Sequence, residues 1–330
     1  MNVQNHNGNR VLVTGAAGFI GSHLCETLIK NGSEVVGLIG PECDTRWIEH
    51  LDMTLIRGDL TDKKSLLKAL PGINRVYHLA GKLGGSKSEK IFKTNYEGTK
   101  NLVDVCLENG AKVDRFLFVS SHAVMGPTPK DKLYNEEMEC RPVSDYGKSK
   151  LMAEQYLQAI NGQLPHTIVR MPIVFGPRSL KGLFSVYQLL GKRLNFNIKK
   201  GESNVGFVQD MVDAIIEASQ SQETVGKAYF IGDKTIYSLN EIFAAIQKTV
   251  GKKSVKIKVP YFIAYLFAAS CELHAKMNGG QALLFRKDFK YPFWRMDVSK
   301  AEKDFGFKTR VPLEKGLKIT ADWYRENGFL

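Results

Sequence analysis

Residues 10–21 read Arg-Val-Leu-Val-Thr-Gly-Ala-Ala-Gly-Phe-Ile-Gly. The apolar run at the start predicts a short buried strand, and apolar residues at helical spacing follow the last glycine. Three glycines therefore lie in the turn between a strand and a helix. Gly15 would make the tight turn, Gly18 would let the backbone approach a pyrophosphate, and Gly21 would let the helix pack closely on the strand. The unpaired N–H groups of the helix would then face the phosphates.

The alternation of short apolar runs and helical patterns continues through the first half of the chain. Strands are predicted at 34–39, 54–57, 75–79, 116–120 and 166–170, and helices at 62–70, 89–109 and 144–160. The strands are apolar on both faces, and no hairpin signals separate them. This pattern predicts an α/β protein with a Rossmann-like doubly wound parallel sheet and helices on both faces.

The alternation weakens beyond about residue 176. Helical patterns at 183–190, 211–219, 239–250 and 262–275 are separated by loops rich in Gly, Lys and Asn. We expect a Rossmann domain over residues 1–176 and a smaller, mostly helical substrate-binding region over residues 177–330, with the chain free to cross back. A cleft between them is the expected ligand site. The apolar segment 262–275 is expected to be a core helix or the roof of a pocket, with membrane contact as a third alternative.

The composition excludes several classes of protein. The chain has 330 residues, of which 43% are hydrophobic and 24% charged, so it is neither disordered nor a repeat protein. The net charge is +12, but the basic residues are scattered and nucleic-acid binding is not expected. Five cysteines form no CxxC pair and no cluster has metal-ligand spacing, so we expect a reduced, cytoplasmic protein without a metal. No apolar run reaches the roughly 18–20 residues of a membrane-spanning helix.

The end of the second predicted strand bears on the choice of cofactor. In the dinucleotide fingerprint an acidic residue here binds the 2′-hydroxyl of the adenosine ribose, but this strand ends Gly37-Leu-Ile-Gly40. Arg46, several residues later, is able to reach a 2′-phosphate. The sequence therefore permits NAD or NADP and slightly favours NADP. Asp59 follows the third strand, where it would either bind the adenine amino group or cap the next turn.

Tyr146 and Lys150 lie four residues apart at the start of a predicted helix, so their side chains share one face. A neighbouring ammonium favours the phenolate and lowers the pKa of a phenol, which prepares Tyr146 to exchange a proton with a carbonyl or alcohol oxygen. Ser121, at the carboxyl end of a predicted strand, would hydrogen-bond the same oxygen. The neighbouring His122 is expected to be structural. The alternative is that Tyr146 and Lys150 are two exposed residues on one helix face without a catalytic role.

The chain resembles the extended short-chain dehydrogenase/reductase family, part of the NAD-dependent epimerase/dehydratase superfamily, over nearly its whole length. The matching segments are residues 14–21, 58–60, 78–81, 95–99, 119–121, 146–150, 170–172, 175–177 and 297–301. The resemblance implies that Tyr146 is the proton donor and acceptor, that Lys150 binds the nicotinamide ribose, and that Ser121 orients the substrate oxygen. Asn95 would help to hold the active-site framework. The resemblance also implies a cofactor site formed by Gly15, Ala17, Gly18, Phe19, Ile20, Asp59, Leu60, Leu79, Ala80, Gly81, Tyr146, Lys150, Pro172 and Ile173.

Departures from the family pattern narrow the expected activity. Nucleotide-sugar epimerases usually carry Asn where Ile173 stands and Arg near Ser203, and both polar anchors for a diphosphate are missing here. Dehydratases follow the catalytic hydroxyl with Asp-Glu, whereas this chain has His122-Ala123. Residues 260–271 and 291–294 resemble the branch of 3β-hydroxysteroid dehydrogenases and dihydroflavonol reductases.

The resemblance thus implies an NAD(P)-dependent oxidoreductase that interconverts a secondary alcohol and a ketone on a fairly apolar small molecule. A nucleotide-sugar 4-epimerase that uses the same three residues is the first alternative, and a non-catalytic dinucleotide-binding sensor is the second. A homodimer formed through the helices at 89–109 and 144–160 is also expected.

Overall fold

The computed structural model describes residues 9–83, 87–108, 113–160, 162–192, 194–196, 201–251, 255–257, 266, 269–270, 273 and 291–330. The apolar segment predicted as a helix at 262–275 therefore lies almost entirely outside the described residues.

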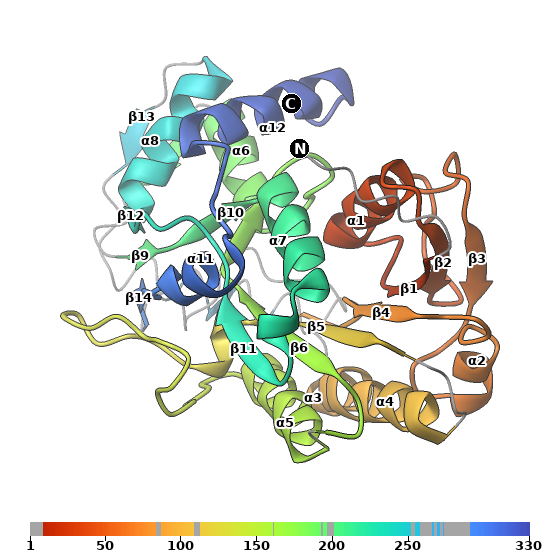
Figure 1. Cartoon of the computed structure of the whole chain (residues 1–330). Coiled ribbons are helices and arrows are strands. Elements are labelled where there is room, and N and C mark those ends of the chain that lie inside the picture. Colours follow the sequence, from red (N-terminus) through yellow and green to blue (C-terminus); the bar gives the residue numbers. More distant parts are fainter. Residues whose placement is uncertain are drawn as a thin grey trace.

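A seven-stranded parallel sheet forms the centre of the molecule (Figure 1), with the strand order β11-β6-β5-β4-β1-β2-β3. The strands are β1 (Arg10–Thr14), β2 (Glu34–Ile39), β3 (Thr54–Arg57), β4 (Arg75–His78), β5 (Arg115–Ser121), β6 (His166–Met171) and β11 (Lys227–Phe230). The direction of strand addition reverses between β1 and β4, and ligands bind beyond the carboxyl ends of strands at such a reversal. The predicted doubly wound sheet is confirmed.

Helices cover both faces of the sheet (Figure 1). On one face lie α1 (Phe19–Lys30) and α7 (Val208–Gln220), which share a buried apolar cluster with the sheet. On the other lie α2 (Lys63–Leu67), α3 (Ser88–Phe92), α4 (Gly98–Glu108) and α5 (Asp145–Ala159). The long helix predicted at 89–109 is interrupted by a π-helical turn, η1 (Lys93–Glu97), which contains Asn95.

The chain beyond residue 176 forms a second packed cluster and also returns to the central sheet. The cluster contains α6 (Leu183–Gly191), α8 (Leu239–Val250) and α12 (Leu313–Glu326), and α11 (Ser299–Phe305) packs beside β11. Three small sheets pair β7 (Ile173–Phe175) with β10 (Val205–Phe207), β9 (Glu202–Ser203) with β12 (Tyr237–Ser238) and β14 (Phe293–Trp294), and β8 (Leu194–Phe196) with β13 (Val255–Ile257). Helix α7 and strand β11 belong to the main sheet layer, so the chain crosses back.

A buried ion pair joins α5 to the central sheet. Arg170 of β6 donates from Nε and a terminal nitrogen to the carboxylate of Glu154 on α5, with a shortest distance of 2.7 Å. The two side chains are 4% and 1% exposed. Two buried charges are tolerated only with close, multiple hydrogen bonds, so this contact sets the position of α5 on the sheet.

No helix among the described residues is long and apolar enough to cross a membrane, and no group of metal-ligating side chains occurs within the same ranges.

We expect Glu154→Gln to lower the free energy of unfolding by about 3–5 kcal/mol, because it leaves the Arg170 guanidinium buried without a counter-charge. Glu139→Gln is the matched control: Glu139 pairs with Arg141 at 2.7 Å, but both side chains are more than 70% exposed, so its loss should cost under about 1 kcal/mol. Urea unfolding of the two variants measures both values. Equal losses would show that the buried pair has no special role.

Candidate active site

The residues predicted for the site all come together at the carboxyl ends of the strands in the central sheet. They follow β1, β3, β4 and β6, end β5, or lie in the first two turns of α1 and α5. In the sheet register Ser121 of β5 stands opposite Met171 of β6, so Pro172 and Ile173 continue just past the level of Ser121. Ile173 opens β7 and is partly buried in the second packed cluster.

The glycine loop after β1 has room for backbone only. Gly15 has φ +71°, and a Cβ added there would lie 2.9 Å from the backbone nitrogen of Ala80. A Cβ on Gly21 would lie 2.1 Å from the carbonyl oxygen of Gly15. Both positions exclude side chains because two backbones approach each other there, which is the geometry expected for a nucleotide-binding turn.

The amino end of α1 is open to a ligand. Gly18 is exposed at the N-cap position, no side chain caps the helix, and no acidic residue occurs in its first turn. The neighbouring Ala17, Phe19 and Ile20 are partly exposed. The first-turn N–H groups and the positive end of the helix dipole therefore suit the pyrophosphate of a dinucleotide.

On the adenosine side, the two candidate residues have partners of their own. The Asp59 carboxylate accepts hydrogen bonds from the backbone N–H of Thr61 at 2.8 Å and from its hydroxyl at 2.9 Å, so it does cap the next turn. Its contact with adenine stays a prediction. Arg46 pairs with Asp44, and this pairing raises the pKa of Arg46 and lowers that of Asp44. A 2′-phosphate would have to compete with Asp44 for Arg46. Leu60 is buried beneath Gly98.

Ser121 and Tyr146 are brought together by close packing at the start of α5. Ser144 caps the helix by accepting from the N–H of Gly147 at 3.1 Å. A Cβ on Gly147 would lie 2.4 Å from the carbonyl oxygen of Ala123, so the helix end sits directly on the turn after Ser121. The Ser121 hydroxyl accepts a hydrogen bond from the N–H of Ala123 at 3.2 Å, and it lies close enough to the Tyr146 phenol to lower the pKa of that phenol.

Lys150 is buried behind this pair. Its ammonium donates to the carbonyl oxygen of Val119 at 2.9 Å and lies 4.6 Å from the centre of the Phe118 ring. Burial lowers the pKa of Lys150 to about 8, and the negative charge of Glu154, one helical turn further along, opposes this shift.

The pKa of the Tyr146 phenol corrects an expectation. Burial raises this pKa to about 12, and the neighbouring Ser121 hydroxyl opposes the shift only in part. The expectation that Lys150 lowers the pKa of Tyr146 is therefore wrong, because desolvation of the phenolate dominates while the ammonium is itself buried and directed to Val119. Tyr146 holds its proton at neutral pH.

Asn95, in the π-helical turn, holds the backbone that follows β4. It is 0% exposed, accepts from the N–H of Lys82 at 2.7 Å and donates to the carbonyl of Lys82 at 3.0 Å. In a third hydrogen bond, Asn95 donates to the hydroxyl of Ser149 on α5 at 3.0 Å. A Cβ on Gly81 would lie 3.3 Å from the Lys150 ammonium. The backbone of residues 81–82 is thereby fixed against Lys150.

Residues from three distant parts of the chain meet beside Ser121. The ring of His122 stacks on Trp294 of β14, with ring centres 5.1 Å apart and planes at 23°. Trp294 stands opposite Ser203 in the register of β9 and β14. Ser203 is buried, and its hydroxyl donates a hydrogen bond to the carbonyl oxygen of Asn204. Burial lowers the pKa of His122 to about 4, so the ring is neutral at neutral pH. The structural role expected for His122 stays a prediction, and the position of Trp294 was not predictable from any local pattern.

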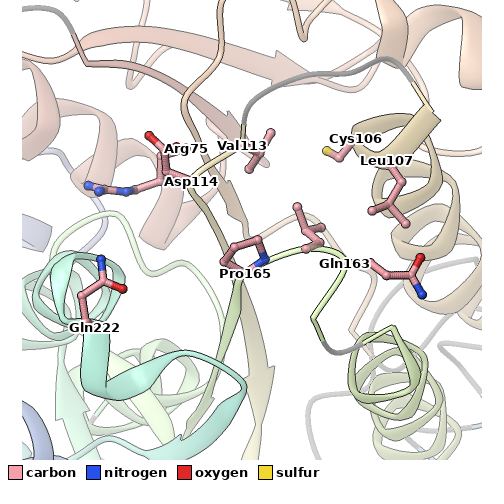
Figure 2. A pocket seen from close by; sticks show the side chains of 9 residues that line it. Arg75, Cys106, Leu107, Val113, Asp114, Gln163, Pro165 and Gln222 are labelled. Atoms are coloured by element: carbon pink, nitrogen blue, oxygen red, sulfur yellow. The ribbon is translucent and has the colours of Figure 1, made fainter.

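A cavity of about 550 Å³ lies away from this site, at the amino ends of β4, β5 and β6. In Figure 2, Arg75 and Gln222 lie on one side of it and Cys106, Leu107 and Gln163 on the other. None of the predicted site residues lines this cavity, so it does not correspond to the cleft expected between the two units.

Comparisons with known proteins agree with this geometry. Residues 11–232 match the NAD dependent epimerase/dehydratase family. A 2-alkyl-3-oxoalkanoate reductase of Stenotrophomonas maltophilia is 25% identical, with 94% of this chain and 97% of the relative covered. A UDP-N-acetyl-alpha-D-glucosaminuronate decarboxylase of Bacillus cytotoxicus is 29% identical, with 96% of this chain and 98% of the relative covered. The solved structure of a UDP-glucuronic acid 4-epimerase from Bacillus cereus, in complex with UDP-glucuronic acid and NAD, has a TM-score of 0.76 at 27% identity and covers 96% of this chain and 99% of that one.

The chain is therefore an enzyme that belongs to the NAD dependent epimerase/dehydratase family, as the family match, the glycine turn and the open amino end of α1 together indicate.

Proposed function

We propose that the protein is an NAD(P)-dependent oxidoreductase that interconverts a secondary alcohol and a ketone on a fairly apolar small molecule. The observation that carries this proposal is the placing of Ser121, Tyr146 and the buried Lys150 together, because the start of α5 packs directly on the turn after Ser121. Two neighbouring hydroxyl groups are able to hold one substrate oxygen between them.

The proposed chemistry follows from the protonation state of these side chains. A bound nicotinamide dinucleotide would supply or accept the hydride. Tyr146, with a pKa of about 12, keeps its proton at neutral pH and would donate it to the oxygen of a ketone as that oxygen gains negative charge. Ser121 would orient the same oxygen, and Lys150 would bind the nicotinamide ribose. A protonated phenol is ready to assist reduction of a ketone. Oxidation of an alcohol first requires the phenol to lose its proton.

The surroundings of Ile173 and Ser203 support an apolar substrate. Ile173 offers no hydrogen bond, and the hydroxyl of Ser203 is already used within the protein. A diphosphate placed there would lose its hydration without gaining charged partners from these two residues. The similarity to a reductase of 2-alkyl-3-oxoalkanoates, which carry alkyl chains, points the same way.

For the cofactor, we propose that the site takes NAD or NADP. No carboxylate ends β2, so nothing at that strand end repels a 2′-phosphate. Arg46 remains the candidate partner of that phosphate, and the preference for NADP depends on its release from Asp44.

A nucleotide-sugar 4-epimerase is the second candidate, because the UDP-glucuronic acid 4-epimerase has the same fold over nearly its full length. It would use the same Ser121, Tyr146 and Lys150. A non-catalytic dinucleotide sensor fits less well, because this chain belongs to an enzyme family and retains all three side chains.

We also propose a cytoplasmic homodimer. Four of the five cysteines, Cys25, Cys43, Cys106 and Cys140, lie in the described part of the chain and are free there, which suits a reducing compartment. Helices α4 and α5 lie side by side on one face of the sheet and would form the contact between two copies (Figure 1), which a sedimentation-equilibrium mass of twice the chain would support.

We expect Gly15→Ala to weaken dinucleotide binding by at least about tenfold, because the new methyl group displaces the backbone at Ala80 and disturbs the N–H groups that would bind phosphate. Gly32→Ala is the matched control: its φ of +80° imposes similar strain, but nothing lies within 4 Å of the added Cβ. Fluorescence titration with reduced dinucleotide measures both affinities. If the two variants bind alike, the glycine turn does not hold the cofactor.

Tyr146→Phe should reduce turnover by at least about 100-fold, because it removes the proton that a ketone oxygen must receive. Dinucleotide affinity should stay close to that of the wild type. Tyr156→Phe, on the same helix, removes a phenol that is bonded to Asp104 away from Ser121 and should leave turnover nearly unchanged. The rate is followed by absorbance of reduced nicotinamide in a screen of steroid, flavonoid and alkyl ketones. Retained turnover in Tyr146→Phe would remove Tyr146 from the mechanism.

Isothermal titration with uridine diphosphate separates the two candidate functions. An oxidoreductase without polar anchors at Ile173 and Ser203 should bind it with a Kd weaker than about 1 mM. A Kd near about 1 μM would favour the epimerase and contradict the assignment of an apolar substrate site.

A further inference from the structure

Lys82 is an exposed lysine whose backbone is held beside the predicted catalytic lysine. Asn95 binds both the N–H and the carbonyl of Lys82, at 2.7 and 3.0 Å. The preceding Gly81 is so close to Lys150 that a Cβ on it would lie 3.3 Å from the ammonium. The backbone of Lys82 therefore has a fixed place next to the site, while its side chain is free to extend from it.

The charge of Lys82 is not neutralised by a neighbour in the part of the chain that the structure describes: no carboxylate there lies within ion-pair distance of its ammonium. Glu154, the buried acid nearest in sequence to Lys150, is occupied by Arg170. The site thus presents two lysines, one buried and one exposed, and a substrate with a negative charge would meet an uncompensated ammonium there.

Two of the similar proteins act on substrates that carry a carboxylate in the same relation to the reacting carbon. A 3-oxoalkanoate has its oxo group two bonds away from the carboxylate carbon. Carbon 4 of glucuronic acid is likewise two bonds away from the carboxylate carbon of that sugar. An ammonium beside the reacting carbon would serve both arrangements.

We propose that the substrate carries a carboxylate two bonds away from the carbon that is oxidised or reduced, and that Lys82 binds this carboxylate. The inference rests on the oxidoreductase function proposed above. In the oxidising direction, the C–H bond of the 3-hydroxy acid breaks and its hydride passes to an oxidised nicotinamide dinucleotide. The hydroxyl proton passes to the phenolate of Tyr146, which forms when the phenol first releases its own proton to solvent. The product is the 3-oxo acid, and the carboxylate is unchanged.

Lys82 would then act in recognition and not in proton transfer. The flexible stem of a lysine lets its ammonium follow carboxylates on alkyl chains of different shape. An ester of the same acid keeps the shape and the reacting carbon but lacks the charge. Comparison of an acid with its methyl ester therefore isolates the contribution of Lys82.

The test compares 3-hydroxydecanoate with its methyl ester as substrates of the full-length protein, read by absorbance of reduced nicotinamide. The wild type should prefer the acid. Lys82→Gln should raise KM for the acid by about tenfold, with little change in kcat, in KM for the ester or in KM for the dinucleotide. Lys82→Arg should restore most of the preference, because it keeps the charge. Lys148→Gln, which removes an exposed charge from α5 between Tyr146 and Lys150, is the matched control and should behave as the wild type.

A binding measurement separates failure of this inference from failure of the proposed function. Decanoate lacks the reacting hydroxyl, and its affinity by isothermal titration should fall about tenfold in Lys82→Gln. If decanoate binding depends on Lys82 but no alcohol or ketone is turned over, the proposed function is wrong and the carboxylate site stands. If the wild type turns over acid and ester equally, or if Lys82→Gln weakens both alike, the carboxylate site is wrong and the oxidoreductase stands.

Discussion

The buried ion pair between Glu154 and Arg170 is the contact on which the arrangement of the site depends. It attaches α5 to β6 with both charges almost completely removed from water. Such a pair is stable only in a narrow geometry, because each charge needs several hydrogen bonds to replace its hydration. Tyr146 and Lys150 lie two turns and one turn before Glu154 on the same helix. Their positions relative to Ser121 on the neighbouring strand follow from that one attachment and from the close packing of Gly147.

Much of the fold was predictable because it depends on local patterns. Apolar strands that alternate with helices require a covered parallel sheet, and glycine spacing reveals the backbone contact between Gly15 and Gly21. The seventh strand, β11, was missed because its four residues, Lys227–Phe230, are too short an apolar run to stand out where the alternation of strands and helices weakens. Trp294 was missed for a different reason: it reaches His122 through pairing of short segments far apart in sequence, which leaves no periodic signal. The roles of the predicted site residues remain predictions.

Proton chemistry was the part that sequence reasoning described least well. The spacing of Tyr146 and Lys150 correctly places both on one helix face, but spacing carries no information about burial. Burial raises the pKa of the phenol and lowers that of the amine, so each group moves toward its neutral form. With a pKa of about 8 Lys150 is still mostly protonated at neutral pH, whereas Tyr146 keeps its phenolic proton. The exposed Lys82 is the group that we propose meets a charged substrate.

The segment that contains Trp294 has a consequence for biosynthesis. Its backbone is hydrogen-bonded to residues near the middle of the chain, with Thr128 joined to Phe293 at 2.8 Å and Tyr134 to Arg295 at 3.0 Å. Domains form from the amino end as the ribosome releases them, so the nucleotide-binding sheet emerges well before this segment. A nascent chain would hold its dinucleotide fold with one wall beside Ser121 still missing. Closure of that wall waits for translation to pass residues 293–295.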